Sequence, residues 1–252
     1  DTRYVPLSQK HDFQLTQHHV DKALAHKPKA IIINSGNNPT GAVYDKEVLV
    51  YLVKQCEEAG CWLLSDETYS KLSFKKDYFS LNDFTFPKLV IISSFSKVFG
   101  IPGFRTGFAI ADPSVIDKVT LSSSTLYSCL PIFVQLGACR AMDLIDAFAK
   151  KVKAQYQTII HECMEILGTS SAVRCAEPDA GLYLFMDVSR THLDDIDFTK
   201  QLLEKHKTAV TPGASFGYKG FVRASICGEP KNVKEGIRRL VNFANSLYDN
   251  VE

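Results

Sequence analysis

The sequence predicts an α/β fold: a large domain around a mostly parallel sheet, residues 1–150, followed by a smaller C-terminal α/β domain, residues 151–252. The first observation is a series of short apolar runs without polar alternation, separated by a helical pattern or a long crossover. Such runs are typical of parallel strands covered on both faces. The second observation is a long helical pattern over 131–168, after which shorter strand and helix patterns resume.

Composition excludes several functional classes. The 252 residues are enough for a sizeable core, and 45% hydrophobic with 23% charged residues is ordinary for a globular protein. A formal net charge of +1 argues against nucleic acid as the main partner. No apolar run approaches the roughly 20 residues that span a membrane, and no secretory segment opens the chain. The seven cysteines are scattered without a CxxC pair, which indicates reduced thiols in a cytoplasmic protein, and the histidines show no metal-ligand spacing.

Hydrophobic patterning predicts the elements of the first domain in order. Scattered apolar positions within 13–26 predict a short surface helix, and the β-branched run 30–34 predicts a strand that ends in the turn signal 35–41. Asp45 is expected to cap a helix that Gly60 ends, because apolar residues recur between them at helical spacing. Further strands are expected at 61–65, 89–92 and 108–110.

The later elements are predicted by the same patterns. Pro113 suits the first position of a helix after Asp112, and a Ser/Thr-rich break is expected at 122–125. The stretch 131–168 predicts a long helix between the domains, with a bend or break near 142–147. The smaller domain is expected to contain strands at 172–175, 182–187, 208–210 and 221–225 and helices at 196–205 and 233–247.

Polar residues follow the ends of the predicted strands of the large domain. They are Asn38, Asp66, Tyr69 and Lys97. In open parallel sheets the ligand binds outside the carboxyl ends of the strands. We therefore expect these four side chains to lie on one side of the sheet.

The stretch 93–107 contains one lysine between two apolar strands. Burial lowers the pKa of a lysine, so Lys97 is a candidate amine nucleophile that forms an imine with an aldehyde. Arg105, together with Ser94 and Ser96, suits a phosphate. An aldehyde that carries a phosphate is pyridoxal phosphate, which we predict as the cofactor. An ordinary serine- and glycine-rich loop with a solvated lysine is the alternative.

Three residues suit the ring of this cofactor. Asp66 could keep the pyridine nitrogen protonated, so that the ring accepts electrons from a carbanion. Tyr69 and Asn38 could hydrogen-bond the ring's phenolate oxygen. The alternatives are a carboxylate that caps a turn, a half-buried core tyrosine, and an Asn-Pro turn with no ligand.

Arg223 lies within the apolar strand 221–225. A buried arginine is rare unless it is paired, and a bidentate grip on a substrate carboxylate would explain it. An ion pair within the chain is the alternative. The nearby stretch 213–217 matches the G-x-S-x-G nucleophile elbow, but that fold needs a histidine after the serine, and the last histidine is His206.

Together these segments resemble the class I/II pyridoxal-phosphate-dependent aminotransferases, of fold type I. The similar motifs are Ser94-Phe95-Ser96-Lys97 with Gly103-Phe104-Arg105-Thr106-Gly107, Asn38-Pro39-Thr40-Gly41, Asp66-Glu67-Thr68-Tyr69 and Val222-Arg223-Ala224-Ser225. They occur in the family's order over most of the chain. The chain begins at aspartate rather than methionine, and the resemblance implies that it corresponds to the C-terminal two-thirds of such a protein, with an incomplete sheet and an incomplete cofactor site.

The resemblance implies catalytic and cofactor-binding roles. Lys97 would hold the cofactor as a Schiff base and then act as the general base of the proton shift, a role worth roughly 10²–10⁴-fold in rate. Asp66 would pair with the pyridine nitrogen, and Tyr69 and Asn38 would contact the ring oxygen.

It also implies binding roles. Ser94, Ser96 and Arg105 would hold the phosphate, and Arg223, together with Asn38, would bind the amino acid substrate through its α-carboxylate. Family members are usually homodimers with sites at the subunit interface. Specificity for the substrate side chain would depend on the segment that the chain does not contain, on Tyr127 or on the partner subunit.

The predicted function is transfer of an amino group between an amino acid and a 2-oxo acid. A β-eliminating lyase or a cyclopropane-forming synthase on the same scaffold is one alternative. An aminotransferase-like sensor domain of a transcription regulator, which binds the cofactor without turnover, is another. A purely structural relic is disfavoured because the whole set of cofactor and substrate residues is present.

Overall fold

The computed structural model describes residues 1–249, and the chain forms two compact units. Unit 1 comprises Asp1–Asn37 and Ala42–Val152, and unit 2 comprises Asn38–Gly41 and Lys153–Glu252. The domain division predicted at residue 150 stays a prediction. The short segment Asn38–Gly41 belongs to unit 2, together with the C-terminal part of the chain.

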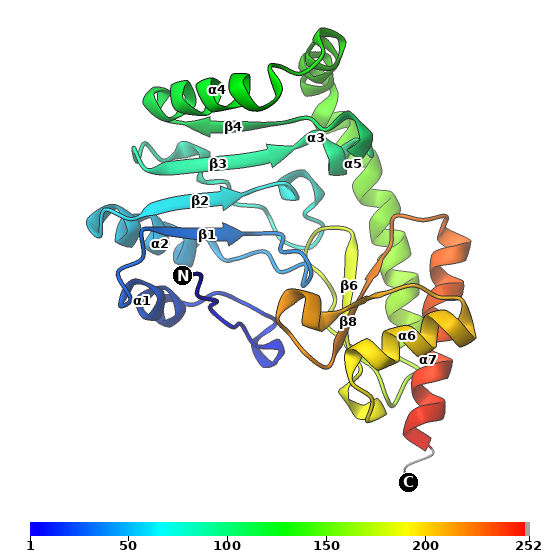
Figure 1. Ribbon diagram of the computed structural model, residues 1–252. Coiled ribbons are helices and arrows are strands. Elements are labelled where there is room, and N and C mark those ends of the chain that lie inside the picture. Colours follow the sequence, from blue (N-terminus) through cyan, green and yellow to red (C-terminus); the bar gives the residue numbers. More distant parts are fainter. Residues whose placement is uncertain (250–252) are drawn as a thin grey trace. The chain divides into compact units, whose positions relative to one another are not determined.

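Unit 1 is built on a four-stranded sheet in the order β1-β2-β3-β4 (Figure 1). The strands are β1 (Ala30–Asn34), β2 (Trp62–Asp66), β3 (Leu89–Ser94) and β4 (Gly107–Ala111). The first three are parallel, and β4 is antiparallel to β3. The sheet is mostly parallel, as predicted, and the carboxyl ends of β1, β2 and β3 lie at one edge.

Helix α2 (Lys46–Glu58) packs on one face of this sheet. It begins after Asp45 and ends before Gly60, as predicted, and Gly60 has the positive φ of 63° that favours glycine. Its buried residues are Val48, Leu49, Leu52, Val53 and Cys56.

The opposite face of the sheet is not covered by the described residues. Ile32 is 73% exposed, although the neighbouring Ile33 is buried. Because successive strand residues point to opposite faces, this alternation marks one covered and one open face. The described residues therefore cover one face of the sheet, and the expected cover on the second face is not among residues 1–249.

The N-terminal helix is shorter than the predicted 13–26. Helix α1 (Gln17–Leu24) buries only Val20 and contacts α2. Asp12 and Phe13 have positive φ values of 50° and 54°, so the chain turns there and Phe13 is buried outside any helix.

Helix α4 (Pro113–Tyr127) begins at Pro113, and the Asp112 side chain accepts a hydrogen bond from the Ser114 backbone N–H at 2.9 Å. The predicted break at 122–125 is wrong. Ser124 and Thr125 donate their hydroxyl hydrogens to the Leu121 carbonyl at 2.8 and 3.1 Å, so the helix satisfies these polar groups itself.

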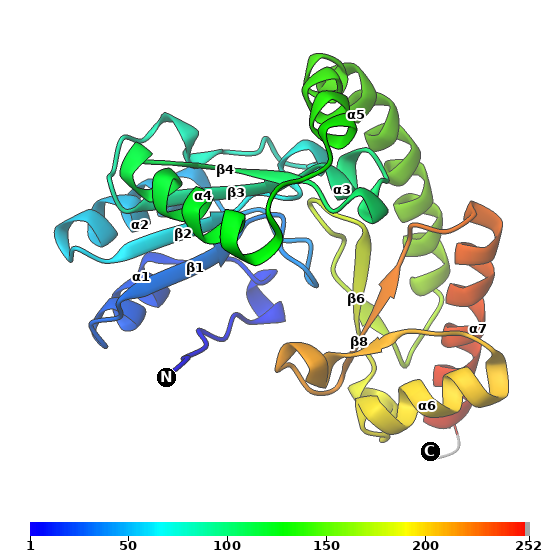
Figure 2. The same ribbon diagram turned by 45° about the horizontal axis from the view of Figure 1, so that its top comes forward.

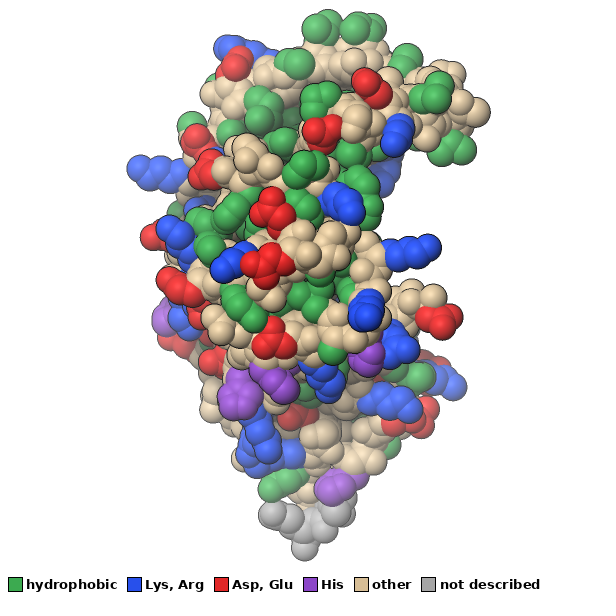
Figure 3. Space-filling view, turned by 90° about the vertical axis from the view of Figure 1, so that its left-hand side faces the viewer, with side chains coloured by type: hydrophobic (Ala, Val, Ile, Leu, Met, Phe, Trp, Pro, Cys, Tyr) green, Lys and Arg blue, Asp and Glu red, His purple; other side chains and the backbone are tan. Residues whose placement is uncertain are grey.

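Helix α4 has no buried residue, and Leu121 and Leu126 on it are 70% and 79% exposed. Figure 3 shows hydrophobic side chains gathered over the upper part of the molecule's face, in the region of α4.

Helix α5 (Ile132–Leu167) is continuous over 36 residues. The break predicted near 142–147 is wrong, because this stretch contains no glycine or proline and the i,i+3 ion pair between Arg140 and Asp143 lies on the helix surface at 2.9 Å. The bend predicted there stays a prediction. The helix belongs to unit 1 up to Val152 and to unit 2 from Lys153.

Unit 2 contains an antiparallel sheet in the order β5-β6-β8-β7 (Figure 2). The strands are β5 (Arg174–Cys175), β6 (Tyr183–Asp187), β7 (Thr211–Pro212) and β8 (Phe221–Ser225). The strand predicted at 208–210 is wrong, because β7 starts at Thr211, where its register pairs it with Arg223.

Helices α6 (Asp195–His206) and α7 (Pro230–Asp249) complete unit 2. Asp194 caps α6 by accepting hydrogen bonds from the Ile196 and Asp197 backbone N–H groups. The two helices meet through the Phe198 and Phe243 rings, whose centroids are 5.1 Å apart.

Short helical turns connect the longer elements. They are α3 (Phe95–Val98) and the 3₁₀ turns η1 (Gln9–His11), η2 (Ser70–Leu72), η3 (Leu81–Asp83), η4 (Pro102–Phe104), η5 (Ser189–Thr191) and η6 (Gly213–Phe216). All seven cysteines are free, as predicted. Within residues 1–249, no helix is both long and apolar enough to cross a membrane.

Candidate active site

Three of the predicted site residues lie at the carboxyl edge of the unit 1 sheet. Asp66 is the last residue of β2, Tyr69 follows it by three residues, and Lys97 lies in α3, directly after β3. The register pairs Asp66 with Asn34 on one side and with Ile92 on the other, so β1 and β2 end level and β3 extends two residues further at the same edge. Parallel pairing thus brings the three to one edge of unit 1.

Lys97 lies in a short helix and not in a loop. The Ser94 hydroxyl caps this helix by accepting a hydrogen bond from the Ser96 backbone N–H at 3.1 Å. The Lys97 side chain is half-buried, and its Nζ has no hydrogen-bond or ion-pair partner among the described residues. A half-buried amine with no partner is available to a ligand.

The two carboxylate oxygens of Asp66 are used differently. Oδ1 accepts a hydrogen bond from the Thr68 backbone N–H at 3.0 Å, which is the turn-capping role considered as the alternative. Oδ2 has no partner within residues 1–249. Asp66 therefore caps its own turn and still presents one free oxygen.

Glu67 is a buried residue that stabilises the same turn through hydrogen bonds. The sequence analysis did not predict a role for it. It is only 4% exposed. Its carboxylate accepts hydrogen bonds from Ser65 Oγ at 3.1 Å, Ser80 Oγ at 2.7 Å and the Leu81 N–H at 3.0 Å. Burial, with the nearby Glu67 charge, raises the pKa of Tyr78, which keeps its phenol protonated. The adjacent acidic pair was the only sequence signal for Glu67.

The predicted phosphate-binding residues lie around α3 and η4. The Ser94 hydroxyl lies 3.4 Å from the Thr106 carbonyl, which joins the two ends of the segment 94–106. Ser96 is buried, and Arg105 is exposed in a left-handed conformation with φ 52°. One Arg105 nitrogen donates to the Pro102 carbonyl at 2.9 Å, which leaves its other donors for an anion.

The guanidinium of Arg223 is the centre of a second polar cluster, in unit 2. It donates to Asn38 Oδ1 at 2.9 Å and to Thr211 Oγ1 at 3.2 Å. Its Cζ lies 4.3 Å from the Tyr183 ring centroid and 4.8 Å from that of Phe216. Nε is buried and has no partner in the described chain, and no carboxylate pairs with the guanidinium there. The ion-pair alternative is therefore not supported for residues 1–249.

The sequence analysis missed Thr211, Tyr183 and Phe216 as neighbours of Arg223. Thr211 is opposite Arg223 in the β7–β8 register, and Tyr183 lies on β6, which pairs with β8 on its other side. No local spacing signals these contacts, because they depend on which strands are neighbours.

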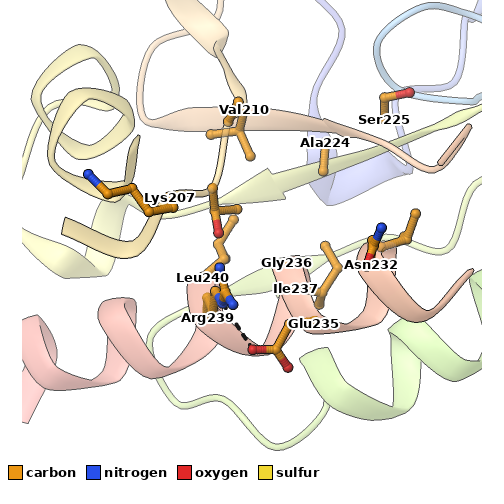
Figure 4. Close-up of a pocket in the computed structure, with 13 residues that line it drawn as sticks. Lys207, Val210, Ala224, Ser225, Asn232, Glu235, Gly236, Ile237, Arg239 and Leu240 are labelled. Atoms are coloured by element: carbon orange, nitrogen blue, oxygen red, sulfur yellow. Dashed lines mark hydrogen bonds and ion pairs between the residues drawn. The ribbon is translucent and has the colours of Figure 1, made fainter. Parts of the chain in front are cut away.

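A groove of about 390 Å³ lies elsewhere in unit 2, between α7 and the strand that carries Arg223 (Figure 4). Its polar lining includes Lys207, Asn232 and Arg239, and Arg239 donates to Glu235 at 2.9 Å. Both Ala224 and Ser225, at the carboxyl end of β8, line it. None of the predicted site residues contributes to it.

Comparison with known proteins shows the family of this chain. The model of the family "Aminotransferase class I and II" matches residues 1–240. The chain belongs to this family. Its enzymes depend on pyridoxal phosphate.

Curated relatives of this class I/II aminotransferase chain are longer. An aspartate aminotransferase of Thermotoga maritima is 32% identical over 237 residues, which are 93% of this chain and 61% of the relative. A probable aspartate/prephenate aminotransferase of Aquifex aeolicus is 33% identical over 250 residues, 94% of this chain and 62% of the relative. The chain thus spans about three-fifths of the length of these relatives.

Solved structures of aminotransferases share the fold. The aspartate aminotransferase of Thermus thermophilus with maleate has a TM-score of 0.88 at 28% identity, covering 94% of this chain and 63% of the other. The aromatic aminotransferase of Pyrococcus horikoshii has a TM-score of 0.90 at 25% identity, covering 96% and 66%. The fold is therefore that of the fold type I aminotransferases.

The residues of unit 1 fit pyridoxal phosphate. The cofactor's aldehyde needs an amine, and Nζ of Lys97 has no partner in the described chain. Its ring nitrogen needs a carboxylate, and Oδ2 of Asp66 has none either. Both groups lie at the carboxyl edge of the sheet, where open parallel sheets bind ligands.

Proposed function

We propose that this chain is the part of a pyridoxal-phosphate-dependent aminotransferase that carries the cofactor lysine and the arginine for the substrate carboxylate. The reaction is transfer of an amino group between an amino acid and a 2-oxo acid. The observation that carries the proposal is that Lys97, whose amine has no partner in the described chain, and Asp66, with one free carboxylate oxygen, lie at the same edge of the unit 1 sheet. Family membership supports the same class of reaction.

The unit 1 residues would hold the cofactor and move the proton. Pyridoxal phosphate, when bound, supplies a ring that accepts electrons from a carbanion. Lys97 would hold the cofactor through Nζ, and the freed Nζ would later take the proton from Cα of the amino acid. Asp66 Oδ2 would keep a proton on the ring nitrogen, and the Tyr69 hydroxyl would donate to the ring oxygen.

The phosphate would be held by Ser94, Ser96 and Arg105. Ser94 and Ser96 lie at the start of α3, and Arg105 follows η4 with donors to spare. Charge-assisted hydrogen bonds from a guanidinium are the strong kind for phosphate recognition.

Arg223 would bind the α-carboxylate of the substrate. Its buried Nε has no partner within residues 1–249, so a carboxylate would satisfy a donor that is otherwise costly to bury. Asn38 accepts a hydrogen bond from Arg223 through Oδ1, and its hydrogen bond to the cofactor ring oxygen stays a prediction.

The test is the visible absorption spectrum of the chain with added pyridoxal phosphate, beside Lys97→Ala and Lys88→Ala. Lys88 precedes the same strand at its amino end and donates to the Gly60 carbonyl, so it is the matched control. We expect a visible absorption band in the parent and in Lys88→Ala, and none in Lys97→Ala. A band in Lys97→Ala, or no band in the parent, would contradict cofactor binding through Lys97.

Product analysis then separates aminotransferase activity from the alternatives. Conversion of an added amino acid to its 2-oxo acid, with amino transfer to a second 2-oxo acid, supports a transaminase. Ammonia release indicates a lyase, and binding without any product indicates a sensor domain. A cytoplasmic location, supported by the seven free cysteines, and a homodimer, typical of the family, belong to the same proposal.

A further inference from the structure

A second buried carboxylate, Asp195, lies in unit 2 and is not explained by the proposed chemistry. It is the first residue of α6 and is only 2% exposed. Oδ2 accepts a hydrogen bond from the Ala214 backbone N–H at 2.7 Å, and Oδ1 accepts one from the Gly220 backbone N–H at 3.1 Å. No cation pairs with Asp195 among the described residues. A buried carboxylate is costly unless hydrogen-bonded, so these two N–H groups are its essential partners.

The two N–H groups belong to one loop of residues 213–220, referred to below as the 213–220 loop. The loop is compact, because the Gly217 N–H donates to the Ala214 carbonyl and the Tyr218 N–H donates to the Gly213 carbonyl, both at 3.0 Å. Gly213 has no room for a side chain, since a Cβ there would lie 2.8 Å from the Phe221 carbonyl oxygen. Asp195 thus binds both ends of a closely packed loop.

The 213–220 loop carries Phe216, one of the two rings over the Arg223 guanidinium. The centroid of the Phe216 ring lies 4.8 Å from Cζ of Arg223. The Phe216 ring also packs edge-on against the Phe185 ring, with the two centroids 6.3 Å apart. An aromatic face attracts a cation and shields it from water. The position of this loop therefore determines what surrounds the guanidinium.

We infer that Asp195 is a positioning residue for Arg223. Through the 213–220 loop it fixes Phe216 against the guanidinium, and so orients the donors that would grip a substrate carboxylate. The carboxylate part of this inference rests on the proposed function, whereas the placement of Phe216 does not.

The first measurement is made without ligand. The ¹H–¹⁵N resonance of Arg223 Nε–H is assigned as the signal lost in Arg223→Lys. Phe216→Leu removes the ring current and shifts this resonance, and we expect Asp195→Asn to shift it in the same direction. The matched control is Asp197→Asn, because Asp197 lies in the same first turn of α6 but is exposed. An Asp195→Asn resonance that coincides with the parent would overturn the inference.

The second measurement is a titration with pyruvate, followed by the same resonance, with pyruvamide as the uncharged control. We expect the midpoint to rise about fivefold or more in Asp195→Asn and in Phe216→Leu. The double variant should be no weaker than the weaker single variant, because both act through one contact. Equal midpoints for Asp195→Asn and the parent would contradict the role in carboxylate binding.

The two measurements separate failure of this inference from failure of the proposed function. If pyruvate leaves the parent resonance unmoved, the carboxylate site itself is wrong, and the ligand-free shift alone decides whether Asp195 places Phe216. If Asp195→Asn does not fold, judged by its circular dichroism, Asp195→Glu replaces it. That variant keeps the charge and displaces the carboxylate by one methylene group, so the same shift is expected.

Discussion

At the scale of single residues, burial divides the cysteine side chains by reactivity. Three of the seven are exposed, namely Cys129, Cys139 and Cys227. Burial raises the pKa of both Cys56 and Cys175 to about 12, so these thiols stay protonated at pH 8. We expect iodoacetamide at pH 8 to alkylate three thiols quickly and the remainder only after unfolding, as counted by intact mass.

The same raised pKa values predict how stability depends on pH. Above the ordinary thiol pKa of 9.0, the unfolded chain releases protons that the folded chain retains, so the free energy of unfolding falls as pH rises from 9 towards 12. A Cys56→Ala variant should lose less stability over this range than the parent. Rapid alkylation of Cys56 at pH 8 would contradict both expectations.

At the scale of elements, one glycine determines whether the turn after β1 can close. Gly41 has φ +75°, and a Cβ there would overlap the Pro178 side chain and lie 2.9 Å from the Ala180 carbonyl oxygen. The Ala180 N–H also donates to the Gly41 carbonyl at 2.9 Å. We expect Gly41→Ala to lower the free energy of unfolding by about 2–4 kcal/mol, combining left-handed strain and overpacking, as measured by urea denaturation.

Gly100→Ala is the control for backbone strain alone. Gly100 has a similar φ of +65°, but nothing lies within 4 Å of a Cβ built there. Its substitution should cost only the left-handed penalty, about 1–2 kcal/mol. Equal losses in the two variants would show that the Pro178 contact contributes nothing.

At the scale of the whole chain, one face of the unit 1 sheet is open among the described residues. Ile32 is 73% exposed on this face, and Ile92 of β3 is 41% exposed. Parallel sheets are ordinarily covered on both faces, and apolar surface of this kind binds hydrophobic dyes. We expect the chain to enhance the fluorescence of anilinonaphthalene sulfonate, and Ile32→Thr to reduce that enhancement without loss of stability.

The adjacent residue gives the matched control. Ile33 points to the face covered by α2 and is buried, so Ile33→Thr should leave the surface unchanged and destabilise the fold by about 1–3 kcal/mol. If Ile32→Thr destabilised the chain as much as Ile33→Thr does, the face would not be open in solution.

The sequence by itself determined the elements whose signals are local. The run 30–34 and the strand 221–225 formed at the predicted residues, and α2 lies between its predicted cap and its terminating glycine. The class of cofactor followed from Lys97 and from Arg105 with its neighbouring serines, because an amine and a phosphate-binding set close in the sequence depend on residue type and short spacing. These features need no knowledge of distant neighbours.

Only the tertiary structure decided which segments meet. The antiparallel β4, the open face of the sheet and the unbroken α4 and α5 depend on packing and on helix capping over many residues. Arg223 donates to Asn38, 185 residues away, and the link from Asp195 to the 213–220 loop crosses a strand and a turn. Hydrophobic periodicity encodes which face of an element is buried, but it does not encode the partner. The residues that surround the Arg223 guanidinium could therefore be identified only from the tertiary structure.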